Sequence, residues 1–287
     1  MNGLIAALRV HRLKIGASFA IDPIVGFPLD YYLLSEIVEE LAFQLTEQHS
    51  RARPVAVKLD HGLTQVLLDL ALIEAEIPHL CLPVSFTTQQ TARALDTNGA
   101  QALYEGAPCQ VVQGFPNSAI VWPRDTARII SANEPTCNQN GTCFTTRHLM
   151  AMVDQVTRSV ERNFGQRHLA LLPPGSLTET ISGFYSTIMT GGTYVVPPRA
   201  MVGLAHPSRP DFALMAKMIS KWRINSLILG PELLAGLIWA LGACGESLPL
   251  LTIVEVVGTE IPQALITSAQ TLGLPVHVSA KRTQLAS

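Results

Sequence analysis

The loop Asn133–Thr142, with the sequence NEPTCNQNGT, occupies a place in the chain where α/β proteins often bind phosphate. It follows an apolar segment, Arg128–Ala132, and precedes a long helical pattern at Thr145–Arg162. Phosphate loops are usually rich in glycine and carry a lysine, because backbone N–H groups and an ammonium group both bind anions. This loop has one glycine, Gly141, and no lysine, so the chemistry expected at this place is incomplete.

Other catalytic patterns are absent from the sequence. It holds no G-x-S-x-G elbow, which argues against a Ser-His-Asp hydrolase, and no G-x-G-x-x-G that would indicate dinucleotide binding. The cysteines beside the loop, Cys137 and Cys143, have no histidine or acid at zinc-site spacing, so we expect no metal. His148 and His168 are interpreted as structural residues, on a helix surface and at the start of a strand.

The composition bounds the kind of protein. The chain has 287 residues, of which 48% are hydrophobic and 15% charged, and a formal net charge of −2. It can bury a large core, and its low charge predicts an apolar surface covered by a ligand, a partner (another protein or a second copy) or another domain. No basic block indicates nucleic acid, no secretory signal is found, and we expect a cytoplasmic protein. The most apolar segment, Ser226–Cys244, contains Pro231 and Glu232 and is interpreted as a strand, turn and helix, not as a membrane span.

Strands and helices alternate along the whole chain. In the first half we expect helices at Asp30–Ser50, with Asp30 as the cap, Gln65–Glu76 and Thr87–Asn98, and strands at Pro54–Leu59, His79–Val84 and Gln101–Tyr104. In the second half we expect helices at Glu179–Met189, Asp211–Trp222, Glu232–Leu241 and Ile261–Leu272, and strands at Arg167–Leu172, Tyr194–Val196, Ser226–Leu229, Thr252–Val257 and Pro275–Val278.

This alternation predicts an α/β protein with two βαβ-type lobes and mainly parallel sheets. We expect an N-terminal segment at residues 1–29, a first lobe at 30–130 and a second lobe at 131–287. Open α/β sheets bind ligands outside the carboxyl ends of their strands. The loops that follow the predicted strands are therefore the candidate site.

The order of elements resembles the large N-terminal domain of adenylate-forming (AMP-binding) enzymes, such as acyl-CoA synthetases and acyl-AMP ligases. The segments that carry the likeness are Val55–Gly106, His168–Pro198, Ser226–Ile238 and Ile253–Val276. They are similar to the family's first βαβαβ run, its middle strand–helix–strand, its acyl-pocket helix and the run into its adenine site. The resemblance covers nearly the whole chain and implies the same fold, without the family's small C-terminal domain.

The family's phosphate loop reads approximately T-S-G-[ST]-T-G-x-P-K-G and aligns with residues 132–141, ANEPTCNQNG. Thr136 and Gly141 are kept, and the resemblance implies that they would contact the nucleotide. Asn140 stands at the position of the lysine, Glu134 at that of the first glycine, and Pro135 removes an N–H donor. A carboxylate about 4 Å from a phosphate charge costs roughly 1 to 4 kcal/mol. The loop therefore resembles a phosphate loop that has lost its phosphate-binding groups.

The adenine and magnesium segment of the family, Y-G-x-T-E, aligns with Ala280–Gln284. Thr283 is kept, whereas the stacking aromatic residue is Ala280 and the metal-binding glutamate is Gln284, whose neutral amide binds magnesium poorly. The turn Gly258-Thr259-Glu260 resembles the family's turn beside adenine, or is a simple strand-to-helix turn. The positions of the family's ribose-binding aspartate and catalytic lysine lie beyond Ser287, the last residue of the sequence.

The resemblance also implies an acyl pocket bordered by Phe184, Tyr185, Leu229 and Leu233, all of which could equally be core residues. We expect a degenerate homologue that binds an acyl group, such as a fatty acid, or a protein partner, has no catalytic residues of its own, and needs no cofactor. The alternative is an active ligase subunit that uses ATP and Mg²⁺ and completes its site with a C-terminal domain from another chain.

Overall fold

The computed structural model describes residues 3–13, 19–115, 120–130, 142–159, 166–173, 175–206, 208–258 and 260–278. The chain forms two compact units. Unit 1 consists of Met1–Ala17 and Leu29–Asp154, and unit 2 consists of Ser18–Pro28 and Gln155–Ser287.

This division differs from the expected lobes at 30–130 and 131–287 and from the expected separate segment at 1–29. Residues 18–28 belong to unit 2 because strand β1 (Phe19–Asp22) pairs in parallel with strand β10 (Thr193–Val195). Arg167 strengthens this attachment, since its Nη2 lies 2.6 Å from Asp22 Oδ2. A pairing between strands so far apart in sequence leaves no local signal, which is why the sequence predicts a separate N-terminal segment.

Unit 1 is built on a six-stranded sheet with the order β6-β5-β3-β4-β7-β8. Its strands are β3 (Val55–Lys58), β4 (His79–Cys81), β5 (Ala102–Glu105), β6 (Gln110–Gln113), β7 (Thr126–Ile130) and β8 (Thr142–Thr145). The inner strands are parallel, which confirms the predicted mainly parallel sheet. The edge strands β6 and β8, which the sequence analysis did not predict, are antiparallel to their neighbours.

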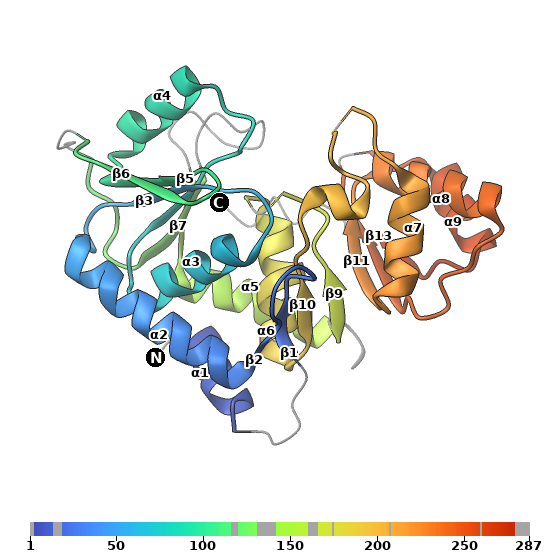
Figure 1. Ribbon diagram of the computed structural model, residues 1–287, viewed down its shortest axis with the longest axis horizontal. Coiled ribbons are helices and arrows are strands. Elements are labelled where there is room, and N and C mark those ends of the chain that lie inside the picture. Colours follow the sequence, from blue (N-terminus) through green and yellow to red (C-terminus); the bar gives the residue numbers. More distant parts are fainter. Residues whose placement is uncertain are drawn as a thin grey trace. The chain divides into compact units, whose positions relative to one another are not determined.

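Helices cover both faces of this sheet. They are α1 (Gly3–His11), α2 (Tyr31–Gln48), α3 (Leu63–Glu74), α4 (Thr88–Asn98) and α5 (Thr146–Ser159). Val55 and Val57 pack with residues of α2 and α3, whereas Ala56 and Leu103 pack with residues of α4. Successive strand residues point to opposite faces, so β3 serves both cores. Figure 1 shows α3 and α4 on opposite sides of the sheet.

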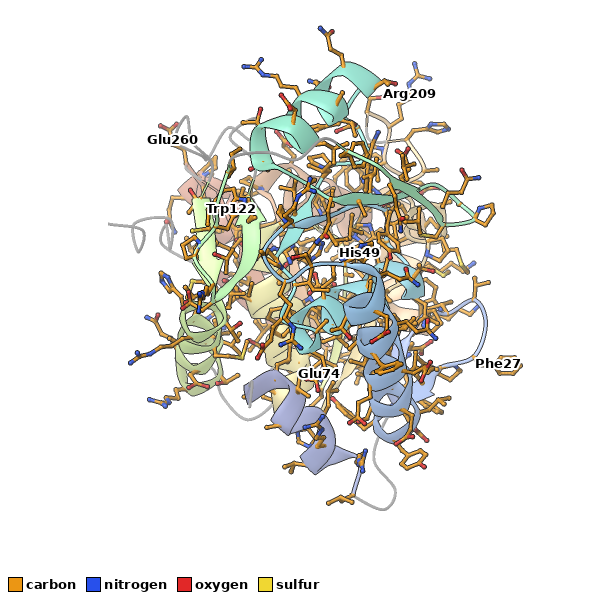
Figure 2. The ribbon with its side chains drawn as sticks, turned by 90° about the vertical axis from the view of Figure 1, so that its left-hand side faces the viewer. Phe27, His49, Glu74, Trp122, Arg209 and Glu260 are labelled. Carbon is orange, nitrogen blue, oxygen red and sulfur yellow. The ribbon has the colours of Figure 1, made fainter. Side chains whose placement is uncertain are left out.

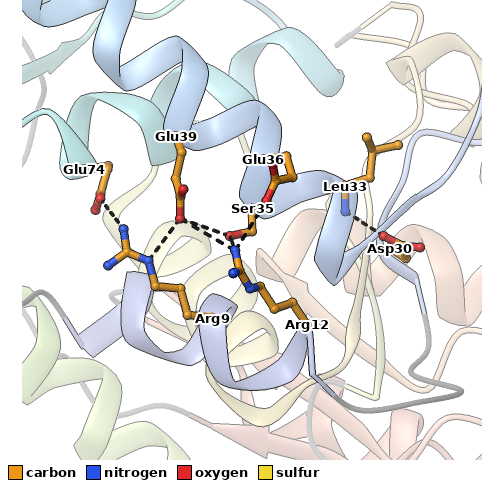
Figure 3. Close-up of polar contacts among 8 residues, drawn as sticks. All are labelled: Arg9, Arg12, Asp30, Leu33, Ser35, Glu36, Glu39 and Glu74. Carbon is orange, nitrogen blue, oxygen red and sulfur yellow. Dashed lines mark hydrogen bonds and ion pairs between the residues drawn. The ribbon is translucent and has the colours of Figure 1, made fainter.

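Side-chain caps fix the starts of α2 and α4. Asp30, the predicted cap of α2, accepts a hydrogen bond from the Leu33 backbone N–H at 2.7 Å (Figure 3). Thr87 and Gln90 form a capping box at the start of α4, and Gly99 ends that helix in the left-handed conformation with φ 66°. These residues satisfy backbone groups that the ends of a helix would otherwise leave unpaired.

Helix α1 was not predicted from the sequence. It packs against α2, and Arg9 joins it to two helices at once, because its guanidinium lies 3.0 Å from Glu39 Oε1 and 2.9 Å from Glu74 Oε1 (Figure 3). Burial raises the pKa of Glu74, an effect that the charge of Arg9 opposes. The contacts that hold α1 thus lie far along the chain.

Unit 2 contains a parallel sheet in which the strands run in the order β13-β12-β11-β9-β10-β1. Its further strands are β9 (Arg167–Leu169), β11 (Ser226–Leu229), β12 (Ile253–Val256) and β13 (Val276–Val278); the two-residue strand β2 (Leu29–Asp30) follows β1 along the chain. Each of the predicted strands of the second half is present, although most are shorter than expected.

The helices of unit 2 are α6 (Ser186–Thr190), α7 (Phe212–Lys221), α8 (Pro231–Cys244) and α9 (Gln263–Thr271), with a π-helix η1 (Glu179–Tyr185) and a 3-10 helix η2 (Arg199–Val202). Asp211 caps α7 by accepting a hydrogen bond from the Leu214 N–H at 2.9 Å. Leu227, Leu229 and Val254 form a core with residues of α7, α8 and α9. The predicted helix at Glu179–Met189 is therefore divided between η1 and α6.

Candidate functional site

Several predicted site residues lie at the carboxyl edge of the unit 2 sheet. Leu229 is the last residue of β11 and pairs in register with Val256, the last residue of β12. Gly258 and Glu260 follow β12 directly, and both are exposed; Figure 2 shows the side chain of Glu260 pointing outward. The structure thus places Leu229, Gly258 and Glu260 where open α/β sheets bind ligands.

Gly258 has a packing role in this turn. A Cβ atom at Gly258 would lie 3.1 Å from Pro231 Cγ and 3.3 Å from Pro231 Cδ. Pro231 opens α8, so glycine allows the strand-to-helix turn to pack against the first turn of that helix. This packing accounts for the glycine without a ligand, and a contact between Gly258 and a nucleotide stays a prediction.

The predicted acyl-pocket residues Phe184 and Tyr185 lie side by side in η1, where they are 3% and 1% exposed. The ring of Phe184 lies 4.8 Å from that of Tyr194 and 5.3 Å from that of Tyr185. Aromatic rings at such distances stabilise each other beyond their buried area. Both residues therefore contribute to a packed aromatic cluster.

The other two predicted pocket residues, Leu229 and Leu233, belong to the core under α8. Leu229 is fully buried, and Leu233 is partly buried against the same cluster. Trp239, on the same helix, is 69% exposed and lies outside this core. Whether an acyl group can enter beside these side chains stays a prediction.

A buried polar network beside η1 was not predicted. His168 Nδ1 lies 3.0 Å from Ser226 Oγ, and His168 Nε2 lies 3.2 Å from Glu179 Oε1. The Tyr194 hydroxyl donates to the same Glu179 oxygen at 3.0 Å, and its ring stacks on the imidazole with centroids 5.9 Å apart. These contacts join η1 to β9, β10 and β11. All four residues are at most 4% exposed, so the network lies in the interior of unit 2.

The sequence carries one signal of this network, namely the small residue in the middle of η1. A Cβ atom at Gly183 would lie 2.5 Å from Glu179 Oε1 and 2.7 Å from His168 Nε2. Glycine therefore leaves the space that the His168–Glu179 pair fills. π-Helices are rare and occur frequently at functional sites, which marks η1 as the irregular element of this unit.

The predicted phosphate loop is attached to unit 1 through two paired strands. Ile130, the last residue of β7, pairs with Thr142, the first residue of β8. β8 therefore lies between the loop and α5, where the sequence analysis expected the loop to lead directly into the helix. Because β7 is parallel to β4, its last residue, Ile130, lies at the carboxyl edge of the sheet. The predicted nucleotide contacts Thr136, Gly141, Thr259 and Thr283 lie outside the described residues, as do Glu134, Asn140 and Gln284.

Among the described residues, no group of three or more His, Cys, Asp or Glu side chains could hold a metal ion. In the same part of the chain, no helix combines the length and the apolar character needed to cross a membrane.

Comparison with solved structures identifies the fold. The inhibitor-bound N-terminal domain of FACL13 from Mycobacterium tuberculosis matches 99% of this chain with a TM-score of 0.79 at 14% identity, over 77% of its own length. The o-succinylbenzoate CoA synthetase MenE from Bacillus subtilis, in complex with its acyl-adenylate intermediate, matches 96% of this chain with a TM-score of 0.76 at 16% identity. The nonribosomal peptide synthetase FmoA3, bound to AMPPNP, matches 98% with a TM-score of 0.78 at 20% identity.

The chain therefore has the fold of the N-terminal domain of adenylate-forming enzymes. It spans 57% of the MenE chain and 31% of the FmoA3 chain. No family model and no curated protein matches the sequence. The fold that the sequence predicted is confirmed. Sequence identities of 14–20% show the fold alone and do not show the activity of this chain.

Proposed function

We propose that the chain is a degenerate homologue of AMP-dependent acyl-CoA synthetases that keeps the fold but does not activate carboxylates with ATP. The observation that carries the proposal is the residue set aligned with the phosphate loop. Glu134 and Asn140 replace the first glycine and the lysine, so the loop has a carboxylate where it needs a small residue and an amide where it needs a cation.

The residues aligned with the magnesium segment point the same way. Gln284 offers a neutral amide oxygen where a carboxylate would balance the charge of Mg²⁺, and Ala280 offers no ring on which adenine could stack. The donor set therefore does not fit a magnesium–triphosphate complex, and we derive no catalytic step through it.

In this proposal, the chain acts by binding an acyl ligand in unit 2 or a protein partner. The acyl group would lie beside Phe184 and Tyr185 of the aromatic cluster in η1, and beside Leu229 and Leu233 of the core under α8. Large apolar side chains at the surface support a partner: in unit 2, Phe27 is 87% exposed and projects from the chain in Figure 2. In unit 1, Tyr32 and Phe43 of α2 are 57% and 63% exposed.

The loss of activity is tested by acyl-dependent exchange of pyrophosphate into ATP, measured with fatty acids of graded length and a competent acyl-CoA synthetase as the positive control. We expect no exchange above the protein-free rate. Exchange that depends on both the protein and the fatty acid would overturn the proposal in favour of an active ligase subunit.

The acyl ligand is tested by calorimetric titration of the same fatty acids into the protein and into Leu233→Trp. The added ring should fill the space beside the unit 2 core and weaken binding by about tenfold or more. Ala235→Trp is the matched control, because Ala235 is an exposed residue of the same helix. Equal binding by all three proteins would contradict an acyl site at Leu233.

A further inference from the structure

Unit 1 contains a cavity of about 330 Å³, and none of the predicted site residues that the structure describes lines it. It is lined by α4 on one side and by residues of β5 and β6 on the other, an arrangement that can be followed in Figure 1. Its lining extends from Thr88, the first residue of α4, to Gly99, the residue that caps its end. A helix of this length spans about 16 Å at 1.5 Å per residue, and the lining residues follow its whole length. Its volume lies within the range of small-molecule sites.

The walls of the cavity are apolar. Leu95 of α4 and Leu103 of β5 belong to the buried core beneath it, and Phe115 packs against the same core. Val112 of the edge strand β6 is 41% exposed and forms the outer wall. A ligand in this cavity would cover apolar surface that is otherwise in contact with water, which is favourable at about 25 cal/mol per Å².

Two side chains at the cavity, Thr91 and Lys58, carry hydrogen-bond donors. Thr91 is 5% exposed, and its buried hydroxyl has no hydrogen-bond partner among the described residues. Lys58 Nζ makes no hydrogen bond within the described part of the chain and lies 3.9 Å from Glu105 Oε2, too far for one. A buried polar group without a partner costs about 1–3 kcal/mol, which a ligand acceptor would recover.

Two backbone carbonyl oxygens of the lining, those of Gly99 and Ala100, already accept hydrogen bonds within the chain. The Arg53 guanidinium donates to Gly99 O at 3.2 Å and to Ala100 O at 2.9 Å. The cavity therefore offers donors to a ligand, and a ligand would have to supply the acceptor.

The charges at the cavity exclude an anion as the favoured ligand. Lys58 is the cation among the described lining residues; it forms an ion pair with Glu105, and Asp96 is a second carboxylate of the lining. A carboxylate ligand that bound the ammonium would also approach Glu105, which pairs with Lys58 across β3 and β5. A neutral carbonyl or hydroxyl oxygen accepts from the ammonium without that repulsion.

We propose that this cavity binds a neutral small molecule with a linear aliphatic body and one acceptor oxygen, such as an alcohol, ketone or ester. The aliphatic body lies along α4 against Leu95 and Leu103, and the oxygen accepts hydrogen bonds from Lys58 and Thr91. The site lies wholly within unit 1 and goes beyond the function proposed for unit 2.

The test compares 1-octanol, octanoate and octylamine, which share a chain and differ in charge, by saturation-transfer NMR on the full chain. We expect 1-octanol to bind most tightly. Tighter binding of octanoate or of octylamine, or no binding of 1-octanol, would overturn the proposal.

Variants locate the site. Ala92→Phe adds a ring at the cavity mouth and should abolish binding of 1-octanol, whereas Thr97→Phe, at an exposed position of α4 outside the lining, should leave it unchanged. Lys58→Met keeps the length of the side chain, removes its donors and should weaken binding about tenfold. Denaturant unfolding of each variant shows that it is folded. Binding of 1-octanol that survives Ala92→Phe, or that is lost equally in Thr97→Phe, would contradict this location. The unit 2 variant Leu233→Trp should bind 1-octanol as tightly as the unchanged protein.

Discussion

At the scale of single residues, unit 2 depends on a glycine in the middle of a buried polar network. Gly183 leaves room for the contact between His168 and Glu179, and that contact ties η1 to β9. A methyl group there would have to displace a buried carboxylate or imidazole, both of which are held by further hydrogen bonds. Glycine is therefore required here by close packing, since its φ is not in the left-handed region.

We predict that Gly183→Ala lowers the free energy of unfolding by about 1–3 kcal/mol, the usual cost of overpacking a core. Gly242→Ala is the matched control, because a Cβ atom at Gly242 in helix α8 would meet nothing within 4 Å. That change should raise the free energy of unfolding by about 0.5 kcal/mol, since alanine favours helix over glycine. Urea unfolding measures both. Equal stability of Gly183→Ala and the unchanged protein would refute the stabilising role of the network.

Unit 1 has its own buried cluster, in which His79 and Arg128 both approach Asp69. Arg128 Nη1 lies 2.9 Å from Asp69 Oδ2, and His79 Nδ1 lies 3.3 Å from the same oxygen. Burial lowers the pKa of His79 below its usual value of 6.5, against the opposing effect of Asp69. The imidazole is therefore neutral in the folded chain at a pH where the unfolded chain already binds a proton.

This difference predicts a pH dependence. Because the unfolded chain binds more protons than the folded chain below about pH 6.5, the free energy of unfolding should fall as the pH drops through that value. Urea unfolding between pH 7.5 and pH 5 measures the slope, which should be shallower in His79→Gln. His206→Gln, at an exposed histidine, is the control. A slope that is the same in His79→Gln and in the unchanged protein would show that His79 does not contribute.

At the scale of elements, α4 is fixed by its first residues. Thr87 accepts a hydrogen bond from the Gln90 N–H at 3.2 Å, and the Gln90 side chain accepts one from the Thr87 N–H at 2.8 Å. Both bonds pair backbone N–H groups that the first turn of a helix leaves free. Since α4 forms one wall of the unit 1 cavity, this cap also sets the shape of the proposed ligand site.

Removal of the cap should destabilise unit 1. We predict that Thr87→Ala lowers the free energy of unfolding by about 1 kcal/mol, the typical value for a lost threonine cap. Thr97→Ala, at an exposed position within the same helix, should be neutral or slightly stabilising, because alanine has the higher helix propensity. If both substitutions changed urea unfolding to the same extent, the capping box would not be the cause.

The elements that local sequence determines were predicted well. Asp30 was predicted as a cap and the structure confirms it, and the helix predicted from Asp211 is present with Asp211 as its cap. The elements that were missed depend on distant contacts: α1 is held by the pairing of Arg9 with Glu39 and Glu74, and β6 is a wholly exposed strand. In β6 no alternation of buried and exposed residues marks a strand, whereas Leu4, Ile5 and Leu8 of α1 do lie at helical spacing, a signal that the prediction of an N-terminal segment did not use.

The position of three candidate site residues could be predicted from the order of the strands, and their contact with a ligand stays a prediction. Leu229, Gly258 and Glu260 follow from one rule, that ligands bind at the carboxyl ends of parallel strands, and the structure brings them to one edge. The network of His168 with Glu179 could not be predicted, because its members come from β9, η1, β10 and β11 and meet only when the sheet is assembled. Buried polar partners leave no periodic signal in the sequence.

At the scale of the whole molecule, each unit has its own sheet and core, and the two carry different proposed sites. Unit 2 holds the residues proposed to border an acyl group, and unit 1 holds the cavity proposed for a neutral molecule. The fold is that of the N-terminal domain of enzymes that form adenylates, whereas the residues aligned with their phosphate loop lack its cation and most of its glycines. The proposed function therefore separates the fold of this chain from the chemistry of the enzymes that share it.

Calorimetric titration of MgATP at millimolar concentration, with a competent acyl-CoA synthetase titrated in parallel, tests this separation most directly. We predict no saturable heat of binding, because Glu134 repels the phosphates and neither Asn140 nor Gln284 supplies the charge that would hold them. Saturable binding of MgATP that weakens when Thr136 is replaced by valine would contradict the account and identify a working nucleotide site.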